Sequence, residues 1–142
     1  MPVEFPLGTK VTSFGRVPDP VVPFLLLTKD GYVPFDFLID TGADCSMIPA
    51  SIAQTDLGVD LARCHQEVFV GIEGSGVRVF RGSITLKIGS YPLRVRCVFS
   101  PREHTPLILG RLDLFQRFSI TFDNHRHLIR FTRLPRRHTR QP

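Results

Sequence analysis

One acidic motif stands out in this sequence of 142 residues. The apolar run at residues 37–39 leads directly into Asp40, Thr41 and Gly42. An acid on a tight turn at the end of a buried strand can be brought against a second acid. Two adjacent carboxylates can then serve as general base and general acid. Because the motif occurs once, we expect the second carboxylate to come from another copy of the chain.

A second feature lies well downstream of Asp40. Residues 107–109 are entirely apolar and are followed by Gly110. A glycine here would let this strand pack closely against the acid-bearing turn, where any Cβ would intrude. The spacing of apolar residues predicts a helix over residues 111–117.

The elements that must position these residues are predicted to be mostly β-strands. The sequence has 12 Pro and 11 Gly with short apolar runs between them, a pattern typical of many strands joined by turns. A strand at 21–28, a turn at 29–31 and a strand at 32–39 would deliver Asp40. Further predicted elements are a short helix within 50–57 and hairpins at 66–81, 83–99 and 119–131.

Size and composition indicate one globular domain. The chain is 42% hydrophobic and 22% charged, which is ordinary for such proteins. We divide it into an N-terminal arm at 1–20, loose or forming an edge strand, a domain at 21–131 and a basic tail at 132–142. Three widely spaced cysteines suggest reduced thiols in a cytoplasmic protein. No signal peptide is evident, and the longest apolar run, 21–27, is too short to cross a membrane.

The formal net charge of +5 is concentrated near the C-terminus. A basic tail can bind nucleic acid, but it can equally be a solvated, flexible end. We favour the flexible end, because prolines interrupt the tail and no aromatic residue for base stacking follows Phe131.

The two features together resemble the retroviral-type, or retropepsin-like, aspartic proteases. Residues 40–43 look like the catalytic motif of that family, and residues 108–111 look like its second signature. The glycine-rich segment 71–76 lies between them, where the family carries its flap. The resemblance implies an all-β, closed, barrel-like domain with one short helix, functional as a symmetric homodimer. We expect the last hairpin to contribute to the dimer sheet.

The resemblance implies an aspartic endopeptidase acting on extended polypeptides. One Asp40 from each subunit would form a dyad that shares a proton and activates a water. The scheme needs no covalent intermediate, no metal and no other cofactor. Thr41 would brace the two turns across the dimer axis, and the Gly42 N–H would be available to the carboxylate.

Further site residues follow from the same resemblance. Asp44 is expected to pair with Arg111, and Gly110 and Arg111 would give structural support. The predicted substrate-binding residues are Ala43, Asp44, Met47, Val70, Gly71, Ile72, Gly74 and Ile108, with Pro106 nearby. They suggest apolar side chains beside the scissile bond, in a peptide bound by strand-like hydrogen bonds.

An alternative is a non-catalytic dimer of the same fold that binds peptides or scaffolds a complex, since a fold does not fix a function. The intact Asp40 motif favours the enzyme, because a pure binder has no need of two repelling acids at its axis.

Overall fold

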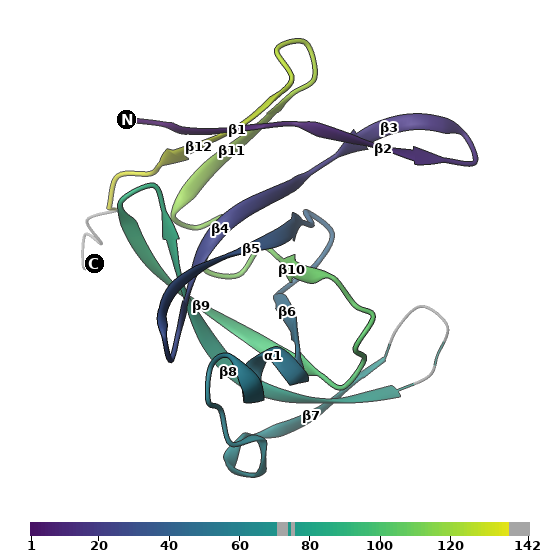
Figure 1. Ribbon diagram of the computed structural model, residues 1–142, viewed down its shortest axis with the longest axis vertical. Coiled ribbons are helices and arrows are strands. Elements are labelled where there is room, and N and C mark those ends of the chain that lie inside the picture. The colour runs from purple at the N-terminus through teal and green to yellow at the C-terminus, as the bar shows by residue number, and fades with distance from the viewer. Residues whose placement is uncertain (71–73, 75, 137–142) are drawn as a thin grey trace, which may run out of the picture.

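The computed structural model describes residues 1–70, 74 and 76–136, and its strands are shown in Figure 1. In chain order the elements are β1 (Val3–Pro6), β2 (Gly8–Thr12), β3 (Gly15–Asp19), β4 (Val21–Thr28), β5 (Gly31–Ile39), β6 (Ser46–Pro49), α1 (Ala50–Thr55), a 3-10 turn (Leu61–Arg63), β7 (Gln66–Val70), β8 (Gly76–Ile88), β9 (Tyr91–Ser100), β10 (Leu107–Leu109), β11 (Phe118–Asp123) and β12 (Leu128–Arg133). The predicted all-β fold with one short helix is confirmed.

The largest sheet closes on itself. Its strand order is β4-β5-β10-β6-β9-β8-β7, and β4 also pairs with β8. Alternate residues of β4, namely Val22, Phe24 and Leu26, are fully buried in the resulting core, as expected for a strand with one face inward. The closure confirms the barrel-like architecture and leaves few exposed strand edges.

The first strand and the last two strands of the described chain form a separate three-stranded sheet in the order β1-β12-β11. Three aromatic rings join it to the barrel: Phe24 lies 5.2 Å from Phe5 and 5.1 Å from Phe131 between ring centroids. Both pairs are edge-to-face, a favoured aromatic geometry. Of the two alternatives for the N-terminal segment, residues 3–6 therefore form an edge strand. The last hairpin lies where the sequence predicts it, with β12 extending to Arg133.

The helix predicted over 111–117 is wrong, because this segment forms turns. Only isolated helix-type bonds are made, such as Phe115 N–H to Arg111 O at 3.0 Å. Asp113 has a φ of 67°, a left-handed conformation that cannot continue a right-handed helix.

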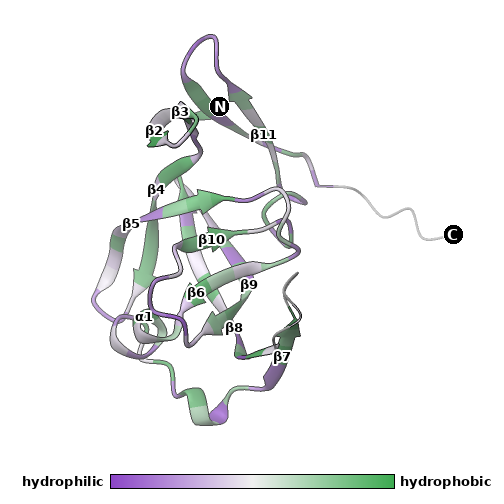
Figure 2. Cartoon of the chain, turned by 90° about the vertical axis from the view of Figure 1, so that its right-hand side faces the viewer, coloured by the Kyte–Doolittle hydropathy of each residue, from purple (hydrophilic) through white to green (hydrophobic). Residues whose placement is uncertain are grey.

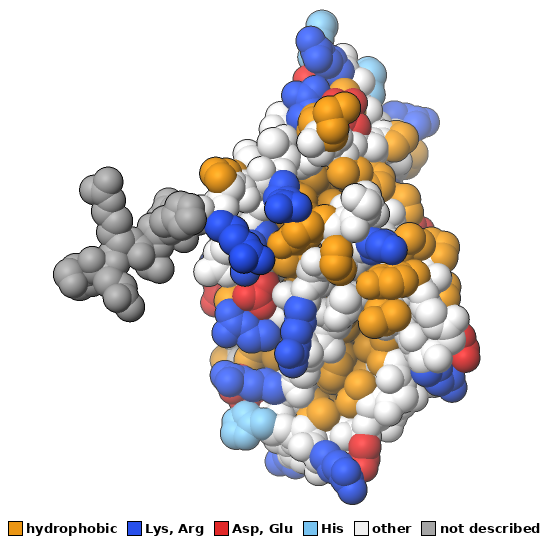
Figure 3. All heavy atoms as spheres, turned by 90° about the vertical axis from the view of Figure 1, so that its left-hand side faces the viewer, with side chains coloured by type: hydrophobic (Ala, Val, Ile, Leu, Met, Phe, Trp, Pro, Cys, Tyr) orange, Lys and Arg blue, Asp and Glu red, His pale blue; other side chains and the backbone are white. Residues whose placement is uncertain are grey.

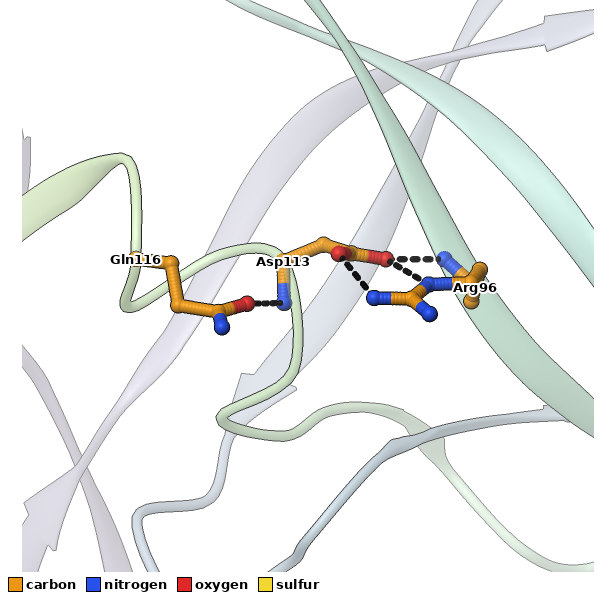
Figure 4. A network of polar contacts seen from close by, with 3 residues as sticks. All are labelled: Arg96, Asp113 and Gln116. Carbon is orange, nitrogen blue, oxygen red and sulfur yellow. Dashed lines mark hydrogen bonds and ion pairs between the residues drawn. The ribbon is translucent and has the colours of Figure 1, made fainter. Parts of the chain in front are cut away.

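Asp113 is held in this conformation by polar contacts that Figure 4 shows. The guanidinium of Arg96 donates to both carboxylate oxygens of Asp113, at 2.9 and 3.0 Å, and its backbone N–H donates at 2.8 Å. The Asp113 N–H donates to the side chain of Gln116 at 2.8 Å. The contacts tie the segment after Gly110 to β9.

These bonds to Arg96 lower the pKa of Asp113 below its ordinary value, against a smaller opposing effect of burial. A lowered pKa stabilises the fold above the unfolded-state pKa of about 3.9, and this contribution is lost as the pH falls through the folded-state pKa. We expect Asp113→Asn to lower the melting temperature by a few degrees at pH 7. The difference from wild type should shrink steadily below about pH 4.

Asparagine tolerates the left-handed backbone, so the Asp113→Asn variant isolates the charge. Melting curves from pH 7 down to pH 2.5 test the prediction, with the exposed Asp36→Asn as control. A difference that stays constant over this range would show that the carboxylate charge does not stabilise the segment.

None of the helices in the described part of the chain is long and apolar enough to span a membrane. On the face shown in Figure 3, many Lys and Arg side chains are spread around an apolar centre.

Candidate active site

Asp40 lies immediately after β5, at the start of a tight loop that leads to β6. Its N–H donates to the Leu109 carbonyl at 2.9 Å, which fixes the backbone at the strand end. Its carboxylate Oδ1 accepts the N–H of Gly42 at 2.9 Å. The carboxylate is therefore oriented by its own turn. The Gly42 N–H is available to it, as the sequence interpretation expected.

Strand β10 lies between the two strands that flank this loop. It runs parallel to β5, with Leu109 opposite Ile39, and antiparallel to β6, with Ile108 opposite Met47. The acid-bearing loop is thus held on both sides by one downstream strand. Figure 2 looks onto this side of the molecule, with β5, β10 and β6 stacked across its centre.

Gly110 allows the close approach. A Cβ at this position would lie 2.5 Å from the Cys45 carbonyl oxygen and 2.8 Å from that of Ala43. Both distances are well inside normal contact, and both atoms belong to the backbone of the loop. The predicted intimate packing of Gly110 against the acid-bearing turn is present in the structure.

Arg111 binds the same loop through its backbone and its side chain. Its N–H donates to the Ala43 carbonyl at 2.9 Å, and its guanidinium donates to the Thr41 carbonyl at 2.8 Å. The predicted ion pair between Arg111 and Asp44 is also present, through one guanidinium nitrogen and one carboxylate oxygen. Asp44 is largely exposed, so the contact positions the loop more than it stabilises the fold.

Ser46 is a supporting residue that the sequence interpretation missed. Its side chain is fully buried, and its hydroxyl accepts the N–H of Gly110 at 3.1 Å. The bond satisfies a backbone donor that would otherwise be buried without a partner. The sequence feature that could have indicated this supporting role is a small polar residue placed between the acidic loop and an apolar strand.

The cysteines near the site are poor nucleophiles. Burial, helped by the negative charge of Asp44, raises the pKa of the Cys45 thiol. Burial raises the pKa of Cys97 to about 12. Both thiols remain protonated at neutral pH, and the thiolate is the reactive form. Neither thiol is therefore in its reactive form beside the loop.

The predicted substrate-binding residues fall into two groups. Ala43, Met47 and Ile108 are partly buried around the acidic loop, while Val70 and Gly74 are exposed on the hairpin of β7 and β8. Gly71 and Ile72 lie outside the described residues. Their assignment to substrate binding, and that of the hairpin to a flap, stays a prediction.

A cavity of about 240 Å³ beside the loop was not foreseen. Cys45 and Leu112 line it together with Phe69, Arg81 and Arg96 from β7, β8 and β9. Arg81 is paired with Glu67 and Arg96 with Asp113. The cavity connects the end of the acidic loop with the β7–β8 hairpin.

No group of three or more His, Cys, Asp or Glu side chains suited to a metal occurs among residues 1–70, 74 and 76–136.

The fold and this loop define an aspartic protease domain. Over residues 27–111 the sequence matches the aspartyl protease family, and the chain belongs to that family. No curated protein sequence matches it significantly.

Two solved structures are similar to this chain. The EIAV protease in complex with the inhibitor HBY-793 is 27% identical, with a TM-score of 0.52, over 69% of this chain and 86% of that one. A retropepsin-like aspartic protease from Rickettsia conorii has a TM-score of 0.61 and covers 92% of this chain and 91% of its own. At 16% identity, the second likeness shows the fold alone. The resemblance to the retropepsin-like aspartic proteases that the sequence indicated is confirmed.

Proposed function

We propose that this chain is an aspartic endopeptidase that works as a symmetric homodimer. The observation that carries the proposal is the single Asp40 carboxylate, oriented by the Gly42 N–H on a loop that β10 holds in place. One such loop supplies half of a two-acid site. A second copy of the chain, related by a twofold axis beside Asp40, supplies the other half.

In the proposed mechanism, the two Asp40 carboxylates lie within a few ångströms of each other. Two like charges this close are not both ionised easily, so the dyad holds one shared proton. The ionised carboxylate takes a proton from a bound water, which attacks the scissile carbonyl. The protonated carboxyl polarises that carbonyl, and a proton then passes to the leaving amine.

The neighbouring residues orient this chemistry. Gly42 donates to the carboxylate and limits its rotation, while Thr41 faces the partner's turn and braces the pair. Ala43, Asp44, Met47 and Ile108 line the cleft on the near side. Val70 and Gly74 contact the polypeptide from the β7–β8 hairpin, in keeping with the known backbone pairing of extended peptides. The proposal also assigns Gly71 and Ile72, which lie outside the described residues, to substrate binding.

A shared site makes activity depend on concentration. We expect the peptide-cleavage rate per subunit to fall on dilution, in step with the dimer fraction measured by sedimentation, because a monomer carries half of the dyad. A rate per subunit that stays constant while the protein dissociates to monomers would contradict the shared site.

A further inference from the structure

The hairpin of β2 and β3, residues 8–19, stands apart from the rest of the fold, and we call it the arm. It forms a two-stranded sheet of its own, and within the described part of the chain no other strand pairs with it. Figure 1 shows it projecting from the body on the side to which the end of β5 points. It also lies outside residues 27–111, the part that matches the family. A lone two-stranded hairpin is marginally stable in water, so a surface that packs against the arm would stabilise it.

Two large apolar side chains are exposed near the tip of the arm. Phe14 is 95% exposed and Val11 is 75% exposed. The turn is nonetheless well bonded: the Thr12 hydroxyl donates to the Gly15 carbonyl at 2.9 Å and accepts the Phe14 N–H at 3.1 Å. A fixed turn therefore presents an aromatic ring to solvent, and aromatic side chains of this kind anchor protein interfaces.

A matching cavity lies at the opposite end of the arm, and we call it the base pocket. It has a volume of about 350 Å³ and is lined by Leu7, Pro18, Pro20, Ile39, Thr41 and Phe122, with Asn124 at its edge. Its lining is mainly apolar, and an apolar cavity of about 150 Å³ already holds a benzene ring. The base pocket is therefore large enough for a phenylalanine side chain.

The arm of the same chain cannot fill this pocket. Each strand of the arm has five residues, so the tip lies about 17 Å from the base at roughly 3.3 Å per residue. A second copy related by a twofold axis can fill it, because such an axis beside the arms places each tip at the other's base. Thr41 lines the base pocket, which makes the pocket continuous with the surface that must meet the partner if two Asp40 turns come together.

We propose that the arm clasps a second copy of this chain, with Phe14 of each subunit inserted into the base pocket of the other. The inference rests on the homodimer of the proposed function and adds the surface that holds it. Each inserted ring lies next to Thr41 of the other subunit and so steadies the acid-bearing turn at the axis.

Sedimentation of the full chain tests the arm. Phe14→Ser is expected to weaken dimerisation by about 100-fold or more, because two buried aromatic anchors are lost per dimer. Leu27→Ser is the matched control, since Leu27 is 42% exposed on β4 and should leave dimerisation unchanged. Melting curves establish that both variants are folded.

Mixing two variants tests the pairing of tip and pocket. Asn124→Trp is expected to fill the base pocket and weaken dimerisation on its own. A mixture of Phe14→Ser with Asn124→Trp should contain more dimer than either variant alone at the same total concentration, because one intact arm and one intact pocket meet in the mixed dimer. A mixture no more dimeric than its components would refute the pairing.

The outcomes separate this inference from the proposed function. If wild type dimerises and Phe14→Ser dimerises equally well, the proposed role of the arm in dimerisation is rejected. The homodimer of the proposed function is then unaffected. If wild type is monomeric at every concentration, including those at which it cleaves peptides, both are rejected.

Discussion

Asp40→Asn is expected to reduce peptide cleavage by about 1,000-fold or more, within the range that a general acid–base group contributes. The variant removes both carboxylates of the proposed dyad at once, since each subunit supplies the same residue. Asparagine keeps the side-chain oxygen that accepts the Gly42 N–H, so the turn should keep its shape. Cleavage of a peptide library between pH 4 and pH 7 gives the measurement.

The matched control is Asp36→Asn on the same strand. Asp36 is exposed on β5 and takes no part in the acidic loop, so its variant should cleave at the wild-type rate. If Asp40→Asn cleaved as well as Asp36→Asn, the catalytic assignment would be wrong. The same result would favour a peptide-binding or scaffolding dimer, provided that the library peptides still bound.

Gly110→Ala is expected to lower the free energy of unfolding by about 3 kcal/mol, at the upper end of typical overpacking costs. The new Cβ would lie 2.5 Å from the Cys45 carbonyl oxygen and 2.6 Å from its carbonyl carbon. Backbone atoms cannot rotate away as a flexible side chain can, so β10 or the acidic loop must shift. A shift of about 1 Å at a catalytic group can cost about 100-fold in rate. Denaturant unfolding and peptide cleavage measure the two effects.

Gly8→Ala is the control for the glycine prediction. A Cβ at Gly8 meets no atom within 4 Å, so we expect a change within about 0.5 kcal/mol. If the two variants unfolded at the same denaturant concentration, the packing of Gly110 against the loop would not be the constraint that the structure indicates.

The parts of the site that the sequence predicted are those with a local physical cause. The turn at 29–31 has Gly31 at a φ of 98°, a conformation that favours glycine, and the apolar strand after it ends at Asp40. Gly110 was predicted because a strand that contacts a loop backbone has no room for a Cβ. In both cases the residue type itself carries the constraint.

The parts that were missed depend on contacts between distant segments. The apolar spacing at 111–117 suggested a helix, but Asp113 turns out of the helical conformation to bind Arg96 of β9. Ser46 serves as acceptor for a residue on another strand. The local sequence does not identify the partner of either residue, since both contacts form only after the barrel closes.

The N-terminal segment shows the same limit. The prolines and glycines of residues 1–20 suggested either a loose segment or an edge strand. They did not reveal that residues 8–19 form a separate hairpin. The exposure of Phe14 at its tip is a property of the folded chain. A single aromatic residue in a polar segment gives no indication of whether it is buried or presented.

Titration of wild-type protein with inactive Asp40→Asn subunits tests the central claim most directly. If each active site needs one acid from each of two chains, mixed dimers are inactive, and wild-type activity must fall toward zero as excess Asp40→Asn is added and subunits exchange. Wild-type activity that stays unchanged while sedimentation or labelled subunits show full exchange would contradict a site shared between two chains.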